Sequence, residues 1–353
     1  MILDRYIGRS ILVNSTLALF ALVAVFSFFS LVDQLDDTGR GNYEIADAVQ
    51  YVLLTIPRLS YELFPIAIVI GSMASLGMLA NSSELAVIRT SGISQAQLAY
   101  SLVKTGLIFV VISIFIGEIV APVTEQAAQQ KRSIALTKQI AMKTKHGFWS
   151  RDGDNYINIR KILPGDRVEE IYIYEFDKEH HLRSSIYAKH AEYNENNWVL
   201  YDISKTNITE EQVTNNNYDT AKWEALLNPE VINMVTIKPR YLSILGLISY
   251  IDYLKSNSQS SKQYIQAFWS KLISPFSIIA MLLLSICVVR CEARPMGLGQ
   301  RIFVGALIGI TFNLLNQVSG HLGVIYGVPA FFSACLPTIL VFSYIYHRLS
   351  NSY

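Results

Sequence analysis

The sequence predicts an α-helical membrane protein with six spans and an inserted all-β, jelly-roll-like domain outside the membrane. Of the 353 residues, 51% are hydrophobic and only 16% are charged, whereas soluble proteins carry about 25% charged residues. Six apolar segments are long enough to cross a bilayer, and a polar insertion between the third and fourth is rich in Tyr, Ile and Val. The net charge of +1 gives no indication of nucleic-acid binding.

The apolar segments set the domain organisation, because a helix needs about 20 apolar residues to cross the hydrocarbon core. They run approximately over residues 11–32, 53–80, 100–121, 268–290, 302–319 and 329–347. The first ends in LVDQLDD without a small-residue cleavage site, which favours a retained span over a removed signal peptide. We therefore expect spans 1–3 within 1–122, the inserted domain at 123–262, and spans 4–6 within 263–353.

The charges of the short loops predict the orientation. If the N-terminus is inside the cell, the inner loops hold Arg5, Arg9, Arg89, Lys104, Arg290, Arg294, Arg301 and Arg348 against Asp4, Glu84 and Glu292. The first outer loop, 33–50, holds five acidic residues and only one basic residue, Arg40. Because Lys and Arg accumulate in cytoplasmic loops, both termini are expected in the cytoplasm and the insertion outside.

The insertion changes from helical to strand periodicity. Strands are expected at 171–176, 184–193, 198–208 and 233–239, separated by turn clusters such as RDGDN (151–155), LPGDR (163–167), NENN (194–197) and TNNN (214–217). Short strands at this spacing are typical of a sandwich or jelly roll. Helices are expected at 123–145 and 243–259, where the chain leaves the third span and approaches the fourth.

Motifs for chemistry are missing from the sequence. It contains no GxxxxGK[ST] for a nucleotide triphosphate, no GxSxG for a nucleophilic serine, and no HExxH for zinc. The three cysteines form no CxxC pair. We therefore expect a protein that is not an enzyme and that binds no cofactor or metal itself.

Basic residues near the ends of the spans are candidates for lipid contact. Arg58 lies near the outer start of the second span, Lys131 and Arg132 follow the third, and Arg301 opens the fifth. These side chains either snorkel to the interface or bind an anionic head group, which a guanidinium contacts through two parallel hydrogen bonds. Glu118 is expected near the outer end of the third span.

Residues 81–94, NSSELAVIRTSGIS, predict a short helix between the second and third spans. Asn81 is the expected N-cap, and Glu84 would complete a capping box three residues later. Leu85 and Ile88 share one side of the helix, and Gly92 suits a left-handed stop. A second capping box is expected where the next helix begins, from Ser94 and Gln97.

This short helix carries few charges. Helices that lie on lipid are usually rich in Lys and Arg, whereas this one has only Arg89 and Glu84. An exposed helix of this kind, held by two spans, suits docking into a groove of another protein.

Motifs along nearly the whole chain resemble those of one family. They are LDRYIGR (3–9), LVDQL (31–35), Gly39-Arg40-Gly41, the P…LFP pattern (57–65), LGMLANSSELAVIRTSGIS (76–94), GEIVAP (117–122), FWSRDGDNYINI (148–159), FWSKLISP (268–275), RPMGLGQRI (294–302) and VIYGVPA (324–330). The chain thus resembles the LptF/LptG lipopolysaccharide export permeases of Gram-negative bacteria. The motifs match the G-type branch more fully than the F-type branch.

The resemblance implies one membrane half of an ABC transporter in the bacterial inner membrane. It would extract lipopolysaccharide from the outer leaflet and pass it through the periplasmic β domain toward the outer membrane. The implied partners are an F-type permease (LptF), an ATPase homodimer (LptB) that holds ATP and Mg, a single-span regulator (LptC) and a periplasmic bridge protein (LptA).

The resemblance also implies roles for individual residues. The stretch from about 81 to 93 matches the family's coupling helix, which would assign ATPase coupling to Glu84, Leu85, Ile88, Arg89 and Gly92. The first and fifth spans would line lateral gates. The places near LVDQL where the family tends to be basic hold Ser30, Asp36 and Asp37 here. Lipopolysaccharide binding is therefore expected from the remaining basic residues: Arg132, Lys131, Arg301, Arg58 and Arg40.

Two other classes of function are weighed against this one. An ion-coupled secondary transporter needs carboxylates deep in its spans and inverted repeats, and the sequence indicates neither. A membrane-anchored periplasmic scaffold or sensor needs an output domain in the cytoplasm, and only HRLSNSY follows Tyr346.

Overall fold

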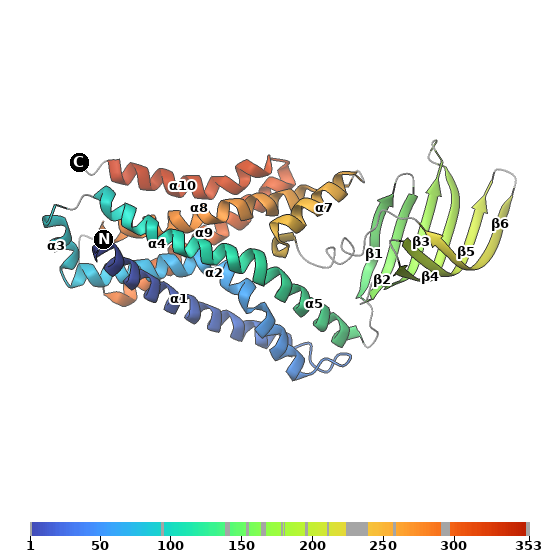
Figure 1. The fold of residues 1–353 in the computed structure, drawn as a ribbon, viewed down its shortest axis with the longest axis horizontal. Helices are drawn as coiled ribbons and strands as arrows, with labels where there is room; N and C mark the ends of the chain where they lie inside the picture. The colour runs from blue at the N-terminus through green and yellow to red at the C-terminus, as the bar shows by residue number, and fades with distance from the viewer. Residues whose placement is uncertain are drawn as a thin grey trace.

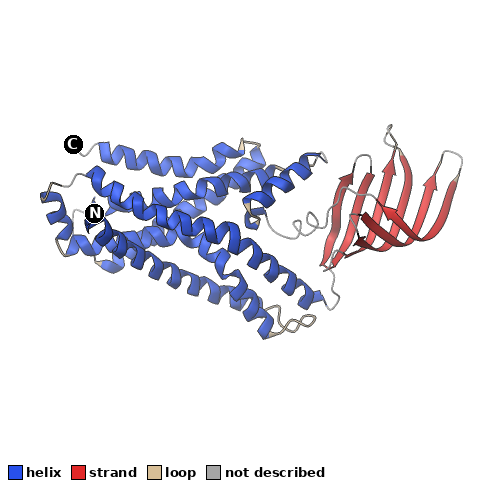
Figure 2. Cartoon of the chain, viewed as in Figure 1, coloured by secondary structure: helices blue, strands red, loops and turns tan. Residues whose placement is uncertain are grey.

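A computed structural model describes residues 2–350, apart from 93–94, 138–141, 153–154, 164–166, 178, 180, 195–196, 210–211, 224–238, 257–258 and 291–296. It consists of a bundle of long helices and a separate β-sheet beyond one end of the bundle (Figures 1 and 2). Residues 121–137 lead from the bundle toward the sheet, and residues 239–256 follow the sheet and precede the fourth span in the chain.

Six helical segments of membrane-spanning length form the bundle. They are α1 (Ile2–Leu35), α2 (Ile45–Asn81), the continuous run of α4 (Gln95–Phe115), η1 (Ile116–Val120) and α5 (Ala121–Thr137), α8 (Lys262–Arg290), α9 (Leu298–Tyr326) and α10 (Ala330–Ser350). The prediction of six spans is confirmed. Most of the helices are longer than the apolar segments, because their ends continue beyond the stretch that is apolar enough to lie in lipid.

Helix α2 is the centre of the bundle. In the most apolar stretch of 18 residues of α2, 83% of the residues are buried. The corresponding values are 11% for α1 and 17% for α9. Helix α2 packs against α1, α5, α8 and α9. Helices α1 and α9 consequently expose broad apolar sides, including Phe20, Phe29 and Phe303, which in a membrane protein face lipid or another subunit.

The sheet contains six antiparallel strands whose neighbours follow chain order. They are β1 (Met142–Asp152), β2 (Asn155–Leu163), β3 (Arg167–Phe176), β4 (Leu182–Asn194), β5 (Asn197–Ile208) and β6 (Val213–Trp223). An inserted all-β domain is thus confirmed, and its described strands form one meandering sheet. Alternating side chains such as Ile157, Ile171 and Leu200 form the apolar core on one face.

Strands β3, β4 and β5 and helix α7 (Ile244–Ser256) match the predicted elements, whereas the other strands differ. The helix expected at 123–145 ends at Thr137, and 142–145 belong to β1, because Met142 pairs with Ile162 and Lys143 with Lys161. The turn expected at 214–217 lies inside β6, an edge strand whose side chains are almost all exposed, so polar residues are not desolvated there. The strand expected at 233–239 lies outside the described residues except for Pro239, which begins the short 3-10 helix η2 (Pro239–Tyr241).

The short helix between the second and third spans is α3 (Glu84–Thr90), at the end of the bundle opposite the sheet (Figure 1). Gly92 has φ +86°, as expected for a left-handed stop. The predicted N-cap is wrong, because α2 continues through Asn81 and the chain turns at Ser83, which has φ 62°. The second capping box lies partly outside the described residues, at Ser94.

Candidate functional site

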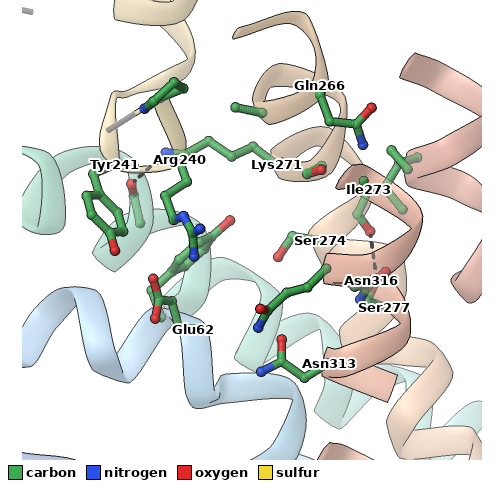
Figure 3. Close-up of a pocket in the computed structure, with 18 of the residues that line it drawn as sticks. Glu62, Arg240, Tyr241, Gln266, Lys271, Ile273, Ser274, Ser277, Asn313 and Asn316 are labelled. Carbon is green, nitrogen blue, oxygen red and sulfur yellow. Dashed lines mark hydrogen bonds between the residues drawn. The ribbon is translucent and has the colours of Figure 1, made fainter. Parts of the chain in front are cut away.

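A cavity of about 580 Å³ lies between the helices near the end of the bundle that carries the sheet. Its walls come from α2, the η1–α5 turn, η2, α8, α9 and α10. Figure 3 shows polar side chains of these elements directed into the space. The lining includes Arg58, Glu62, Arg240, Lys271, Asn313, Asn316, Gln317 and His321.

Arg58 of α2 lines one side of the cavity. Its Nη1 donates a 2.8 Å hydrogen bond to the Tyr241 hydroxyl, and its guanidinium carbon lies 4.7 Å from the centre of the same ring. Its Nε is 3.4 Å from Oε2 of Glu125, whose side chain is fully buried. Because Tyr241 belongs to η2, this arginine ties the segment returning from the sheet to two membrane helices.

Lys271 of α8 also lines the cavity. Its Nζ lies 2.7 Å from Oε1 of Glu118 and donates a 3.1 Å hydrogen bond to the Gly117 carbonyl. Both partners lie in the π-helical turn η1, and such turns inside α-helices are frequent at functional sites. The other carboxylate oxygen of Glu118 accepts a 2.6 Å hydrogen bond from the backbone N–H of Ile244, at the start of α7. One carboxylate therefore joins three helical elements.

The walls formed by α8 and α9 carry polar side chains among apolar ones such as Ile273 and Val324. Residues of α8 at spacings of four, four and three form one stripe, and a second stripe follows on α9. The α8 stripe is Gln266, Ser270, Ser274 and Ser277, and the α9 stripe is Asn313, Asn316, Gln317 and His321. Our sequence analysis missed both stripes. The signal that could have found them is this polar periodicity within otherwise apolar spans.

The expectation that the spans lack deep carboxylates is wrong. Glu62 lies well inside α2 and lines the cavity, and Glu118 and Glu125 lie within the third membrane-spanning segment. These carboxylates are tolerated because they face the interior of the bundle, where Glu118 meets Lys271 and Glu125 meets Arg58.

Two of the predicted lipid-binding arginines meet at one carboxylate outside the cavity. Arg132 Nη2 lies 2.6 Å from Oδ2 of Asp37, and its Nε donates a 2.7 Å hydrogen bond to Gln34. Arg40 Nη1 lies 2.6 Å from the other Asp37 oxygen. Lys131 precedes Arg132 in the sequence and is exposed. Only Arg58, of the five predicted basic residues, lines the cavity.

Arg301, another predicted lipopolysaccharide contact, is buried between α9 and α2. Its side chain is only 2% exposed and donates a hydrogen bond to the Gly77 carbonyl of α2. Gly77 leaves room for the guanidinium, because a Cβ at that position would overlap it. Arg301 therefore packs α9 against α2.

Helix α3 is fixed to the bundle by one side and exposed on another. Leu85 and Ile88 are buried in an apolar cluster that includes Ile7 and Leu102. Glu84 accepts hydrogen bonds of 2.9 Å from the Tyr6 hydroxyl and the Ser82 hydroxyl. Val87 is 65% exposed, so α3 presents an apolar contact to its surroundings. The side chain of Arg89 lies outside the described residues.

A family profile described as "Lipopolysaccharide export system permease LptF/LptG" matches residues 5–349. The chain belongs to the LptF/LptG family. The match covers the helical bundle, α3 and the inserted sheet, and it makes the protein a multi-pass permease of the inner membrane that serves lipopolysaccharide export.

Relatives within the LptF/LptG family agree over almost the full length. The chain is 34% identical to the LptG protein of Haemophilus influenzae over 351 residues, which are 99% of this chain and 98% of the relative. It is also 34% identical to the LptG protein of Escherichia coli K12 over 344 residues, 97% and 96% of the two chains. Both relatives are named lipopolysaccharide export system permease proteins.

Proposed function

We propose that this chain is one membrane half of an ABC exporter that extracts lipopolysaccharide from the outer leaflet of the inner membrane. A second chain would hydrolyse ATP, and a periplasmic bridge would receive the lipid. The observation that carries the proposal is the match to the LptF/LptG family over residues 5–349, together with an exposed helix and a sheet at opposite ends of the bundle.

Helix α3 is the proposed contact with the ATPase. Val87 and Thr90 are exposed there, and Glu84 borders the same surface. Leu85 and Ile88 are buried in the chain's own core, so in this proposal they transmit movement of α3 to the bundle instead of touching the partner. Gly92 would contribute through its left-handed backbone conformation, which ends α3 before α4 begins.

The orientation follows from the positive charges of the inner loops. α3 and both termini are placed in the cytoplasm, and the sheet in the periplasm. ATP and Mg would then be bound by the partner on the cytoplasmic side. The LptA-type bridge and the LptC-type regulator would act in the periplasm or beside the bundle.

A second permease of the F type is the proposed neighbour within the membrane. The apolar sides of α1 and α9 are the surfaces available for it, since they contribute little to the chain's own core. Lipopolysaccharide would enter along these two helices. Of the five predicted basic residues, Arg58 is the proposed contact with lipopolysaccharide because it lines the cavity. Glu125 neutralises part of its charge, as Asp37 does for Arg132 and Arg40.

Co-purification tests the proposal. The full chain is extracted in mild detergent from cells that carry its own partners, and the bound proteins are identified and quantified. A stoichiometric second six-span permease and an ATPase dimer are expected. Recovery of the chain alone, with no ATPase activity that responds to lipopolysaccharide, would refute it.

A further inference from the structure

We propose that the cavity between α2, α8 and α9 is a saccharide-binding site within this single subunit. Its ligand would be the uncharged, hydroxyl-rich sugar part of a glycolipid that arrives through the bilayer. The inference rests on the proposed function, because an exporter of lipopolysaccharide meets such a sugar head. It adds the location of a site and the chemistry that the site recognises.

Two of the cations that line the cavity, Lys271 and Arg58, already have carboxylate partners in the protein. Nζ of Lys271 lies 2.7 Å from Glu118, and Nε of Arg58 lies 3.4 Å from Glu125. Glu62 adds a carboxylate to the lining of the cavity. A phosphate would have to compete with these carboxylates for the same N–H groups, so this wall does not favour a free anion.

The α8 and α9 stripes favour a polyol. An amide offers both donors and acceptors, and a serine hydroxyl offers both as well. Sugar hydroxyls have the same dual character, whereas a phosphate oxygen only accepts. Asn313, Asn316 and Gln317 on α9 line the same space as Ser270 and Ser274 on α8. Figure 3 shows Asn313, Asn316 and Ser274 around it. The volume of about 580 Å³ lies within the range of about 300–1,000 Å³ usual for small-molecule sites.

Gln266 gives a second, independent indication of a ligand. Its side chain is only 8% exposed, and its Oε1 accepts a 2.6 Å hydrogen bond from the Ser333 hydroxyl. Its Nε2 is buried without a hydrogen-bond partner among the described residues. In either orientation of the amide, one polar atom of this cavity-lining side chain is buried without a partner among the described residues, and buried polar atoms of this kind are almost always satisfied. A rotation of the side chain toward the cavity would allow a ligand hydroxyl to supply the partner.

The position of the cavity suits a lipid head group. It lies near the end of the bundle that carries the sheet, and η2, which follows the sheet in the chain, forms part of its wall. Ile325 of α9 lines the cavity and is 74% exposed, so acyl chains can remain in lipid while the sugar enters.

The experiment uses the assembled complex in lipid nanodiscs and two probe lipids. Monoglucosyl diacylglycerol has an uncharged sugar head, and phosphatidate has a phosphate and no sugar. Binding of each is measured by native mass spectrometry for the unmodified chain, for Asn316→Leu, and for the matched control Asn14→Leu. Asn14 is also an amide within a span, but it donates to the Ser10 carbonyl of its own helix and lies outside the cavity.

Asn316→Leu is expected to weaken binding of the glucosyl lipid about tenfold, which corresponds to the loss of about one hydrogen bond. Binding of phosphatidate is expected to stay unchanged. Asn14→Leu is expected to change neither. If Asn316→Leu weakens the binding of both lipids equally, the cavity does not select the sugar and the proposal is wrong. If Asn316→Leu behaves as Asn14→Leu does, the cavity holds only water and the proposal is equally wrong.

Two further measurements keep these outcomes decisive. Asn313→Leu replaces Asn316→Leu if the latter complex does not assemble, since Asn313 lines the same space one turn earlier on α9. Export of lipopolysaccharide by the unmodified complex is measured in parallel. Normal export without glucosyl-lipid binding refutes the saccharide site alone, whereas loss of any response to lipopolysaccharide refutes the proposed function itself.

Discussion

Lys271 and Glu118 form an ion pair of 2.7 Å that joins α8 to the π-helical turn between α4 and α5. The lysine side chain is only 6% exposed, so solvent screens the pair little. Because Glu118 also accepts the N–H of Ile244, the pair fixes the start of α7, which follows the sheet in the chain. Movement of the membrane helices can therefore reach the segment that leads to the sheet.

Lys271→Met should destabilise the protein strongly. It leaves the Glu118 carboxylate in the bundle without its cation, and breaking a buried pair in this way costs about 3–5 kcal/mol. Thermal unfolding in detergent measures the loss. The double variant Lys271→Met/Glu118→Gln should recover much of it, because no uncompensated charge remains. A double variant as unstable as the single one would show that the pair acts only through packing.

Gly77→Ala should lower stability by about 1–3 kcal/mol, the usual cost of overpacking. The new methyl group would overlap the Arg301 side chain, which is buried and has little room to move. Gly106→Ala is the matched control, since its Cβ would meet Ile279 at an ordinary 3.7 Å. Equal melting temperatures for the two variants would contradict the packing role of Arg301.

Asp37→Asn should increase contact between lipopolysaccharide and Arg132. The carboxylate now lies 2.6 Å from both Arg132 and Arg40, so its removal leaves both guanidinium groups free to bind phosphate. A photo-crosslinking residue at position 131 reports the contact in the assembled complex. If crosslinking stays the same, the arginines serve only to hold the loop between α1 and α2.

Acid should loosen the sheet partly through Glu175. Burial alone would raise its pKa, but hydrogen bonds from Ser184 and Lys205 outweigh it and lower the pKa below its usual value. This contribution to stability is present above the unfolded pKa of about 4.3 and is lost as the pH falls through the folded value. After correction for the intrinsic exchange rate, which itself falls with pH, the opening of β3 and β4 measured by hydrogen exchange should therefore rise less on acidification in Glu175→Gln. An identical rise in both proteins would exclude the carboxylate as the cause.

The sequence was most informative where one residue property decides the structure. Apolar length predicted the six spans, and Gly92 predicted the stop after α3, because only a left-handed turn fits there. It failed at Asn81, where a capping residue is absorbed into α2 by the packing of that long helix. Strands β1, β2 and β6 were missed. In β1 and β6, pairing with neighbours, which local propensity does not encode, holds polar residues in the sheet.

The cavity depends on contacts between distant parts of the chain. Arg58 meets Tyr241 and Glu118 meets Lys271 across more than one hundred residues, so no local pattern could place them together. Arg301 carried the right charge for lipid contact, but the sequence could not show that Gly77 opens a buried place for it. The polar stripes of α8 and α9 were visible in the sequence, and their spacing could have predicted a polar interior.

In the proposed mechanism, energy transfer from the ATPase depends on the exposed side of α3. Glu84→Lys reverses the charge there, and Tyr6→Phe is its control, because it removes the 2.9 Å hydrogen bond to Glu84 and keeps the carboxylate. The decisive measurement is the amount of ATPase that co-purifies with each variant, together with its hydrolysis rate in the presence of lipopolysaccharide. We predict that Glu84→Lys loses most of both and that Tyr6→Phe keeps them. Unchanged assembly and hydrolysis in Glu84→Lys would contradict the role of α3 as the coupling helix.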